Sequence, residues 1–213
     1  MAKRERKEAE AGGEARERLL SGATDLFASK GYAATTVREI VERAGVTKPV
    51  LYYYFRNKEG IYLDLMREPF GRFSAAVEET LHAAGSARER LFGLCLMAYD
   101  IFVENIDAAR VMYAIYYGPP QGAPFIDFDA YHRRFQEAVL RVVREGIRDG
   151  EFRRVEPHDA MWAVIGALNV AMEVELCRPP QSFGRDGLRR VLEVVLEGIA
   201  KDRKAAGEKG KKR

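Results

Sequence analysis

Residues 36–60, TVREIVERAGVTKPVLYYYFRNKEG, constrain the fold of this chain more than any other stretch. Thr36 and Glu39 have the spacing of a capping box, in which the Thr side chain binds the N3 amide and the N3 Glu reaches back. Gly45 stands where the end of a helix favours a residue with positive φ. The residues between them that share the i, i+3, i+4, i+7 spacing of one buried helical face are Val37, Ile40, Val41 and Ala44. The stretch therefore begins with a short amphipathic helix.

A second short helix follows after only a few residues. Thr47 is a second N-cap, and Pro49 lies in the first turn, where a missing N–H costs little. Val50, Leu51 and Phe55 form the apolar side of this helix. A helix, a turn containing glycine and another helix are the pattern of a helix-turn-helix.

The other face of the second helix is polar and aromatic. Thr47, Lys48, Tyr52 and Tyr53 offer a hydroxyl, a cation and two phenols, which are groups that contact DNA phosphates and base edges. The three consecutive tyrosines cannot share one face, because neighbours are about 100° apart on a helix. One of them must point away from the core. Periodicity alone leaves open that these tyrosines belong to an ordinary small helix.

Residues 14–66 as a whole resemble the DNA-binding domain of the TetR family of bacterial transcriptional regulators. The resemblance rests on Phe27, on the helix end at residues 30–32, and on the runs TTVREIVERAGV, TKPVLYYYF and NKEGIY, about a quarter of the chain. It implies a homodimer that binds a pseudo-palindromic operator on double-stranded DNA. The expected repressor is released when a small, largely apolar or aromatic effector binds the second domain.

The resemblance also implies which residues contact DNA. Thr47, Lys48 and Tyr53 would face the groove, while Pro49 and Val50 stand where the family often has Gly, Ser or Thr and would touch a thymine methyl. The other residues of the set would hold the backbone. The full set is Thr36, Thr47, Lys48, Pro49, Val50, Tyr52, Tyr53 and Lys58.

Composition agrees with a soluble helical protein. The 213 residues are 47% hydrophobic and 31% charged, and no run reaches the 18 apolar residues of a membrane span. The charged N-terminus lacks the apolar core of a secretory signal, so we expect a cytoplasmic protein without a membrane partner. Cys95 and Cys177 lie far apart in apolar helical patterns, which predicts buried free thiols.

Positive charge gathers at the two ends of the chain. Residues 1–60 hold 12 Lys/Arg and 9 Asp/Glu, and residues 201–213 hold 7 and 2, whereas residues 61–200 hold 16 and 21. Basic ends favour attraction to DNA, although solvated, disordered tails are the simpler explanation. We expect a disordered arm over residues 1–13 and a basic tail over residues 202–213.

The fold class is predicted to be all-α. A first helix ends near Lys30 and completes a three-helix DNA-binding domain over residues 14–66. Asn57 caps the next helix, which Pro69 is expected to kink or break. An effector-binding and dimerisation domain follows over residues 67–201. Its later helices are predicted at about 87–104, 107–117, 124–149, 157–177 and 184–201.

The last two predicted helices are unusually apolar. A helix that is apolar on most faces must be buried on most faces, either in a large core or against a second subunit. The resemblance favours a homodimer through residues 157–177 and 184–201, because TetR-like proteins pair through their last helices.

Aromatic and methionine residues are dense between residues 97 and 135, as in many small-molecule pockets. At each position, ordinary core packing is the simpler explanation. Asn169 and Glu173 share one face of an apolar helix and, if they are buried, need polar partners across the dimer or from a ligand. The candidate effector-binding residues are Met97, Phe102, Tyr113, Tyr116, Phe128, Tyr131, Trp162, Asn169 and Glu173.

Catalytic signatures are absent from the sequence. It has no nucleophile elbow, no glycine-rich phosphate loop and no Cys/His cluster with metal spacing, so we expect no enzyme, no cofactor and no metal site. The alternative to a ligand-responsive repressor is an effector-independent DNA-binding dimer, which shares every motif of the first 66 residues and would differ by a filled second domain.

Overall fold

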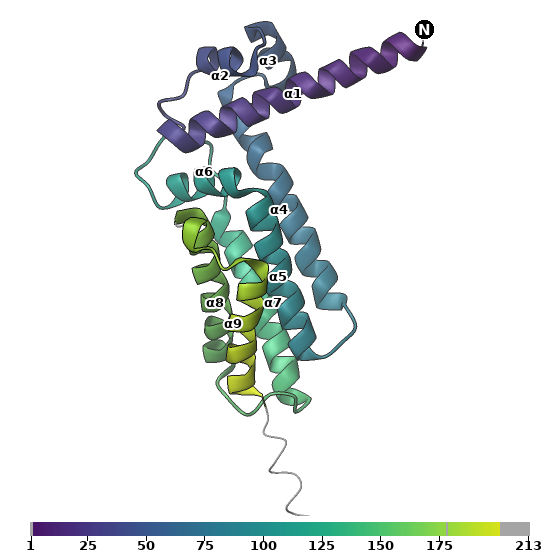
Figure 1. Cartoon of the computed structure of the whole chain (residues 1–213), viewed down its shortest axis with the longest axis vertical. Helices are drawn as coiled ribbons and strands as arrows, with labels where there is room; N and C mark the ends of the chain where they lie inside the picture. The colour runs from purple at the N-terminus through teal and green to yellow at the C-terminus, as the bar shows by residue number, and fades with distance from the viewer. Residues whose placement is uncertain (1, 178, 201–213) are drawn as a thin grey trace, which may run out of the picture. The chain divides into compact units, whose positions relative to one another are not determined.

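A computed structural model describes residues 2–177 and 179–200 (Figure 1). This part of the chain is all-α, as predicted. An isolated β-bridge joins Phe152 and Ala200. The α-helices are α1 (Ala2–Lys30), α2 (Val37–Ala44), α3 (Lys48–Phe55), α4 (Lys58–His82), α5 (Ala87–Glu104), α6 (Ile106–Tyr116), α7 (Phe128–Arg148), α8 (Pro157–Cys177) and α9 (Gly184–Ile199), with a short 3-10 helix at Pro179–Gln181.

The described residues form two compact units. The first unit runs to Gly71 and also contains Asn105–Phe128, and the second contains Arg72–Glu104 and the residues from Asp129 onward. The sequence predicted a boundary near residue 66 and assigned all later helices to the second domain. Instead, α6 and the loop after it belong to the first unit, because α6 packs on α1.

The first unit has its own apolar core. α1 packs against α2, α3 and α6, and α2 packs against α3. Each helix contributes the apolar stripe that its sequence periodicity predicts. The buried side chains of this core are Leu19, Ala23, Phe27, Tyr32, Ile40, Val41, Ala44, Leu51, Phe55, Ile61, Tyr62, Met66, Val111 and Phe128.

The helix α1 extends further than expected. It begins at Ala2, so the arm predicted to be disordered over residues 1–13 is helical from residue 2. Ala, Glu, Lys and Arg dominate this stretch and are strong helix formers, so two glycines do not end the helix. The predicted basic tail lies outside the described residues.

The helix α4 is continuous through Pro69. The break considered for this position is therefore absent. At its start, Asn57 Oδ1 accepts a hydrogen bond of 2.8 Å from the Gly60 N–H, as expected for an N-cap.

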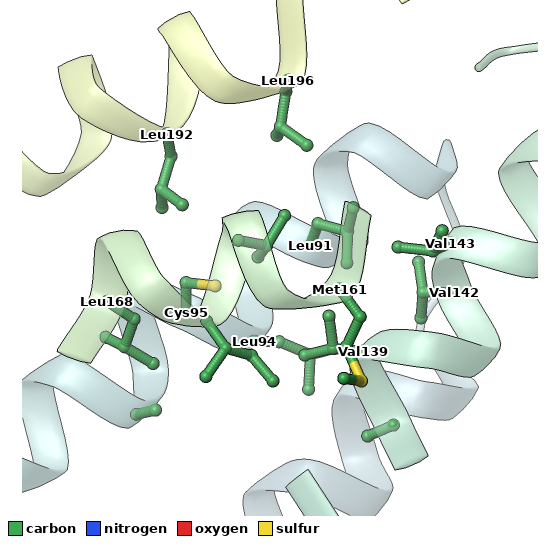
Figure 2. Packing of buried hydrophobic residues seen from close by; sticks show 14 of the residues in the cluster. Leu91, Leu94, Cys95, Val139, Val142, Val143, Met161, Leu168, Leu192 and Leu196 are labelled. Carbon is green, nitrogen blue, oxygen red and sulfur yellow. The ribbon is translucent and has the colours of Figure 1, made fainter. Parts of the chain in front are cut away.

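The second unit packs α5, α7, α8 and α9 around a large aliphatic core. Figure 2 shows Leu192 and Leu196 of α9 facing the cluster that contains Leu91, Cys95 and Leu168. Burial raises the pKa of the Cys95 thiol to about 12. Cys177, by contrast, is exposed, so the prediction of a second buried thiol was wrong.

The helix α8 is long and apolar enough to cross a membrane by length and composition alone. In the structure, Met161, Val164 and Leu168 pack into the core of the second unit. One side of α8 is therefore buried within the protein, whereas Trp162 and Val170 on the helix are exposed.

Candidate DNA-binding site

The capping box at the start of α2 is present as predicted. Thr36 Oγ1 accepts from the Glu39 N–H (3.3 Å) and donates to Glu39 Oε2 (2.8 Å), while the Thr36 N–H donates to the same oxygen (2.9 Å). Lys30 Nζ donates to Glu39 Oε1 at 2.5 Å. These bonds, that of Lys30 first, lower the pKa of Glu39 to about 2.

A Schellman turn ends α2 and fixes the approach to α3. The Val46 N–H donates to the Val41 carbonyl (3.0 Å), and the Gly45 N–H donates to the Glu42 carbonyl (3.3 Å). Gly45 adopts φ 63° and ψ 37°, which is the left-handed conformation that the sequence predicts. These two backbone bonds fix the path of the chain from α2 towards α3.

The helix α3 presents its exposed face as expected. Leu51 and Phe55 are buried, and Tyr54 packs partly against the same core. Tyr53 is 80% exposed and Tyr52 is 48% exposed. The prediction that at least one of the three tyrosines points away from the core is confirmed.

At the start of α3, the polar groups are available to a ligand. Thr47 is the N-cap residue, but its side chain makes no capping hydrogen bond, and Lys48 and Pro49 are exposed. Val50 is half-buried and packs partly against the core of the first unit.

Two of the three N–H donors of Lys58 and the hydroxyl donor of Thr36 are bound within the protein. Lys58 Nζ donates to the carbonyls of Tyr32 (2.8 Å) and Thr35 (2.9 Å), and it lies 4.1 Å from the centre of the Tyr32 ring. Burial lowers the pKa of Lys58. A DNA phosphate can reach the Thr36 hydroxyl only by displacing Glu39. Both residues therefore brace α2 and α4 in this structure, and their phosphate contacts stay predictions.

The structural roles of two residues in this region were not predicted from the sequence. Arg56 has φ 63°, and no Gly or Asn signals a turn at this position. Gln121 accepts from the Tyr32 N–H (2.8 Å) and donates to the Ala114 carbonyl (3.2 Å), which ties the loop after α6 to the end of α1. Its long sequence separation leaves no local signal.

The candidate effector residues fall in both units. In the first unit, Tyr113 and Tyr116 lie on α6, and the Tyr116 ring meets the buried Phe128 ring edge-on at 6.0 Å. In the second unit, Met97 packs partly against the core, and Phe102 is buried. Tyr131, another candidate effector residue of the second unit, lies on α7 and is half-buried.

The remaining candidates lie on the outside of α8. Trp162, Asn169 and Glu173 are exposed at positions i, i+7 and i+11 of one helical face, with Val170 beside them. They do not point into the core of the second unit. On α9, which packs against α8, Val191 and Val194 are exposed as well. An effector role for the three α8 residues stays a prediction. Both α8 and α9 therefore carry exposed apolar side chains.

Within the described ranges, no three His, Cys, Asp or Glu side chains gather into a group that could hold a metal ion.

A short helix, a glycine turn and a second helix with an exposed polar and aromatic face define a helix-turn-helix DNA-binding regulator. The family model described as "Bacterial regulatory proteins, tetR family" matches residues 19–65, and "Tetracyclin repressor-like, C-terminal domain" matches residues 84–173. The chain belongs to the TetR family of bacterial transcriptional regulators.

Two curated relatives match along most of their length. The HTH-type transcriptional repressor KstR2 of Mycolicibacterium smegmatis is 30% identical over 86% of this chain and 90% of its own. The HTH-type transcriptional repressor AcnR of Corynebacterium diphtheriae is 36% identical over 86% of this chain and 90% of its own.

Solved structures show the same fold. The TetR family regulator PfmR of Thermus thermophilus superposes with a TM-score of 0.68 at 28% identity, covering 88% of this chain and 98% of its own. KstR2 of Mycobacterium tuberculosis superposes with a TM-score of 0.69 at 24% identity, over 88% and 95% of the two chains.

Proposed function

We propose that this chain is a cytoplasmic, ligand-responsive repressor that binds a pseudo-palindromic operator as a homodimer. The observation that carries DNA reading is the exposed face of α3, where the Thr47 hydroxyl, Lys48, Tyr52 and Tyr53 meet solvent. The repressor role is supported by the curated names of KstR2 and AcnR.

Dimerisation through α8 and α9 supplies the two recognition helices that an inverted repeat requires. Trp162, which is 54% exposed, lies with Val170 on the outer side of α8, and Val191 and Val194 continue the apolar surface on α9. A partner copy that covers these side chains would remove them from water.

For the effector, a molecule with an apolar or aromatic body is the class to test first. A FadR of Bacillus subtilis, whose fold is shared at 20% identity and a TM-score of 0.62, has been solved in complex with stearoyl-CoA, and the KstR2 of M. tuberculosis is described as a ketosteroid transcriptional regulator. Stearoyl-CoA is therefore a suitable first probe. An acyl-CoA-responsive repressor would be stabilised thermally by it and released from DNA, with free CoA as the control. No stabilisation by any effector would favour a regulator that works without one.

The deciding experiment is a genomic-fragment binding selection with the purified protein at near-physiological salt. We expect enrichment of an inverted repeat, because two α3 helices on a two-fold axis read equivalent half-sites about 34 Å apart. Recovery of DNA without a shared site would contradict operator recognition.

A further inference from the structure

The junction between α3 and α4 contains a strained residue. Arg56 is the single non-glycine residue with positive φ among residues 2–177 and 179–200, and its ψ is −40°. The Asn57 N–H donates to the Phe55 carbonyl at 2.7 Å. An i to i+2 hydrogen bond around such angles is a classic γ-turn, which is rare and strained. Glycine would adopt it at lower cost.

The neighbouring backbone holds this turn in place. The Arg56 N–H donates to the Tyr52 carbonyl (3.2 Å), which closes the last turn of α3. A Cβ on Gly60 would lie 2.0 Å from the Phe55 carbonyl oxygen, so α4 passes directly against the turn. Because the Gly60 N–H is also bound by Asn57, both helices fix the conformation of Arg56. Strain that is held this firmly is typical of functional positions.

Position 56 extends the exposed face of α3. Pro49, Tyr52 and Tyr53 are exposed on one face of α3, and Arg56, the residue that follows the last turn of the helix, is exposed as well. Arg56 thus lies at the opposite end of the helix from Lys48. The eight residues of α3 span about 12 Å, which is similar to the width of the major groove.

Arg56 differs from most nearby cationic side chains in having no acidic partner among the described residues. Within the part of the chain that the structure describes, no carboxylate lies within ion-pair distance of Arg56 or Lys48. Lys58 is committed to the two carbonyls at the end of α1. The nearby cations that are already paired are Lys30 with Glu39, Arg38 with Glu42 and Arg43 with Asp25.

We propose that Arg56 contacts a DNA phosphate at the α3–α4 junction, in addition to the residues that the family resemblance implies. This inference rests on DNA binding through α3. Arg56 is exposed at the C-terminal end of α3, and the donors of its guanidinium suit a phosphate at the edge of the groove, while Lys58 braces the helices from inside. Such a contact adds affinity for any duplex and carries no sequence preference.

The test compares full-length Arg56→Gln and Arg56→Gly with the original protein on two duplexes, one recovered by the genomic selection and one of random sequence. Both variants should lose affinity for the two duplexes by a similar factor. Both should also lower the slope of log K against log salt by about 0.9, the contribution of one phosphate contact. Arg56→Gly should melt at a higher temperature than the original protein, because the strain of the γ-turn is relieved.

Arg67→Gln is the matched control. It removes the same charge from α4, nine residues after Lys58, where Arg67 pairs with Asp64. Its salt slope should equal that of the original protein. An Arg56→Gly protein that binds both duplexes with unchanged affinity and slope would overturn the proposal. If the genomic selection recovers no duplex and the original protein does not bind random DNA either, DNA binding itself is refuted and the Arg56 contact with it.

Discussion

Single residues in the helix-turn-helix divide between those that build it and those that face outward. The donors of Thr36 and the ammonium of Lys58 are bound within the first unit, whereas Thr47 Oγ1, Lys48 and Arg56 meet solvent. A side chain that already has strong partners must lose them before it binds a phosphate. The three residues that meet solvent are therefore better placed to bind DNA.

The charge of Glu39 should stabilise the first unit in a pH-dependent way. Its pKa in the folded protein is about 2, against an ordinary 4.5, so its contribution is complete above pH 4.5 and is lost as the pH falls towards 2. Glu39→Gln should therefore lower the urea midpoint at pH 7, and the difference from the original protein should shrink below about pH 4.5. Midpoints at pH 7, 4.5 and 3 measure this.

Glu42→Gln provides the control for that series. Glu42 pairs only with the exposed Arg38 in the same helix, so its replacement should change the urea midpoint little at any pH. A pH-independent loss in Glu39→Gln would show that the amide fails to cap α2 and that the charge is not the cause.

Tyr62→Phe should leave stability unchanged or raise it by about 1 kcal/mol. The Tyr62 hydroxyl is buried in the first core without a hydrogen-bond partner among the described residues, and burial raises the pKa of Tyr62 to about 12. Removing an unsatisfied buried hydroxyl removes its desolvation cost. Chemical denaturation of both proteins measures the change, and a loss above 1 kcal/mol would mean that this hydroxyl is satisfied.

Whether a contact could be predicted from the sequence depends on how far apart its two residues are along the chain. Gly45 and the Thr36–Glu39 pair act within a few residues, and the sequence predicted both. Lys58 finds its carbonyls 26 and 23 residues away, and Gln121 reaches Tyr32 across 89 residues, so neither contact has a local signature. Arg56 was missed because an arginine occupies a position where turn chemistry predicts glycine.

At the scale of helices, periodicity and capping were enough for most boundaries. The predicted helices at 87–104 and 157–177 match α5 and α8 residue for residue. The predicted helix at 124–149 begins four residues early, because the prediction continued through Asp127, a preferred N-cap residue type that directly precedes α7. The assignment of α6 to the first unit depends on tertiary packing, which periodicity does not encode.

Two glycines that flank α3 should respond differently to alanine. At Gly45, nothing lies near a new Cβ, so Gly45→Ala should cost about 1 kcal/mol from the left-handed backbone alone. At Gly60, the Cβ would meet the Phe55 carbonyl oxygen at 2.0 Å, so Gly60→Ala should cost about 3 kcal/mol or displace α3 from α4. Urea denaturation and operator affinity, measured on both variants, separate the two mechanisms.

If the Gly60 contact is relieved by a shift of α3, Gly60→Ala should lose operator affinity more than it loses stability. Gly45→Ala should keep its affinity once folded. Equal and small losses in both variants would show that the α3–α4 junction relaxes freely, which contradicts a clamped γ-turn at Arg56.

At the scale of the whole molecule, the outer face of α8 and α9 is expected to hold two copies together. Val194 is 72% exposed in the single chain, so Val194→Asp should leave the fold of each subunit intact. Within a dimer interface the new carboxylate would be buried without a partner, at a cost of about 3 kcal/mol or more per site. Light scattering at micromolar concentration should then show a monomer, and operator affinity should fall because one α3 reads one half-site.

Val103→Asp is the matched substitution for this comparison. Val103 lies on α5 of the same unit and is 39% exposed, but it belongs to neither α8 nor α9. We expect this variant to remain dimeric with its operator affinity unchanged. A dimeric Val194→Asp protein would place the interface elsewhere, and the exposed Trp162 and Val170 would then need another partner. Monomers in both variants would show that either carboxylate disturbs the second unit itself.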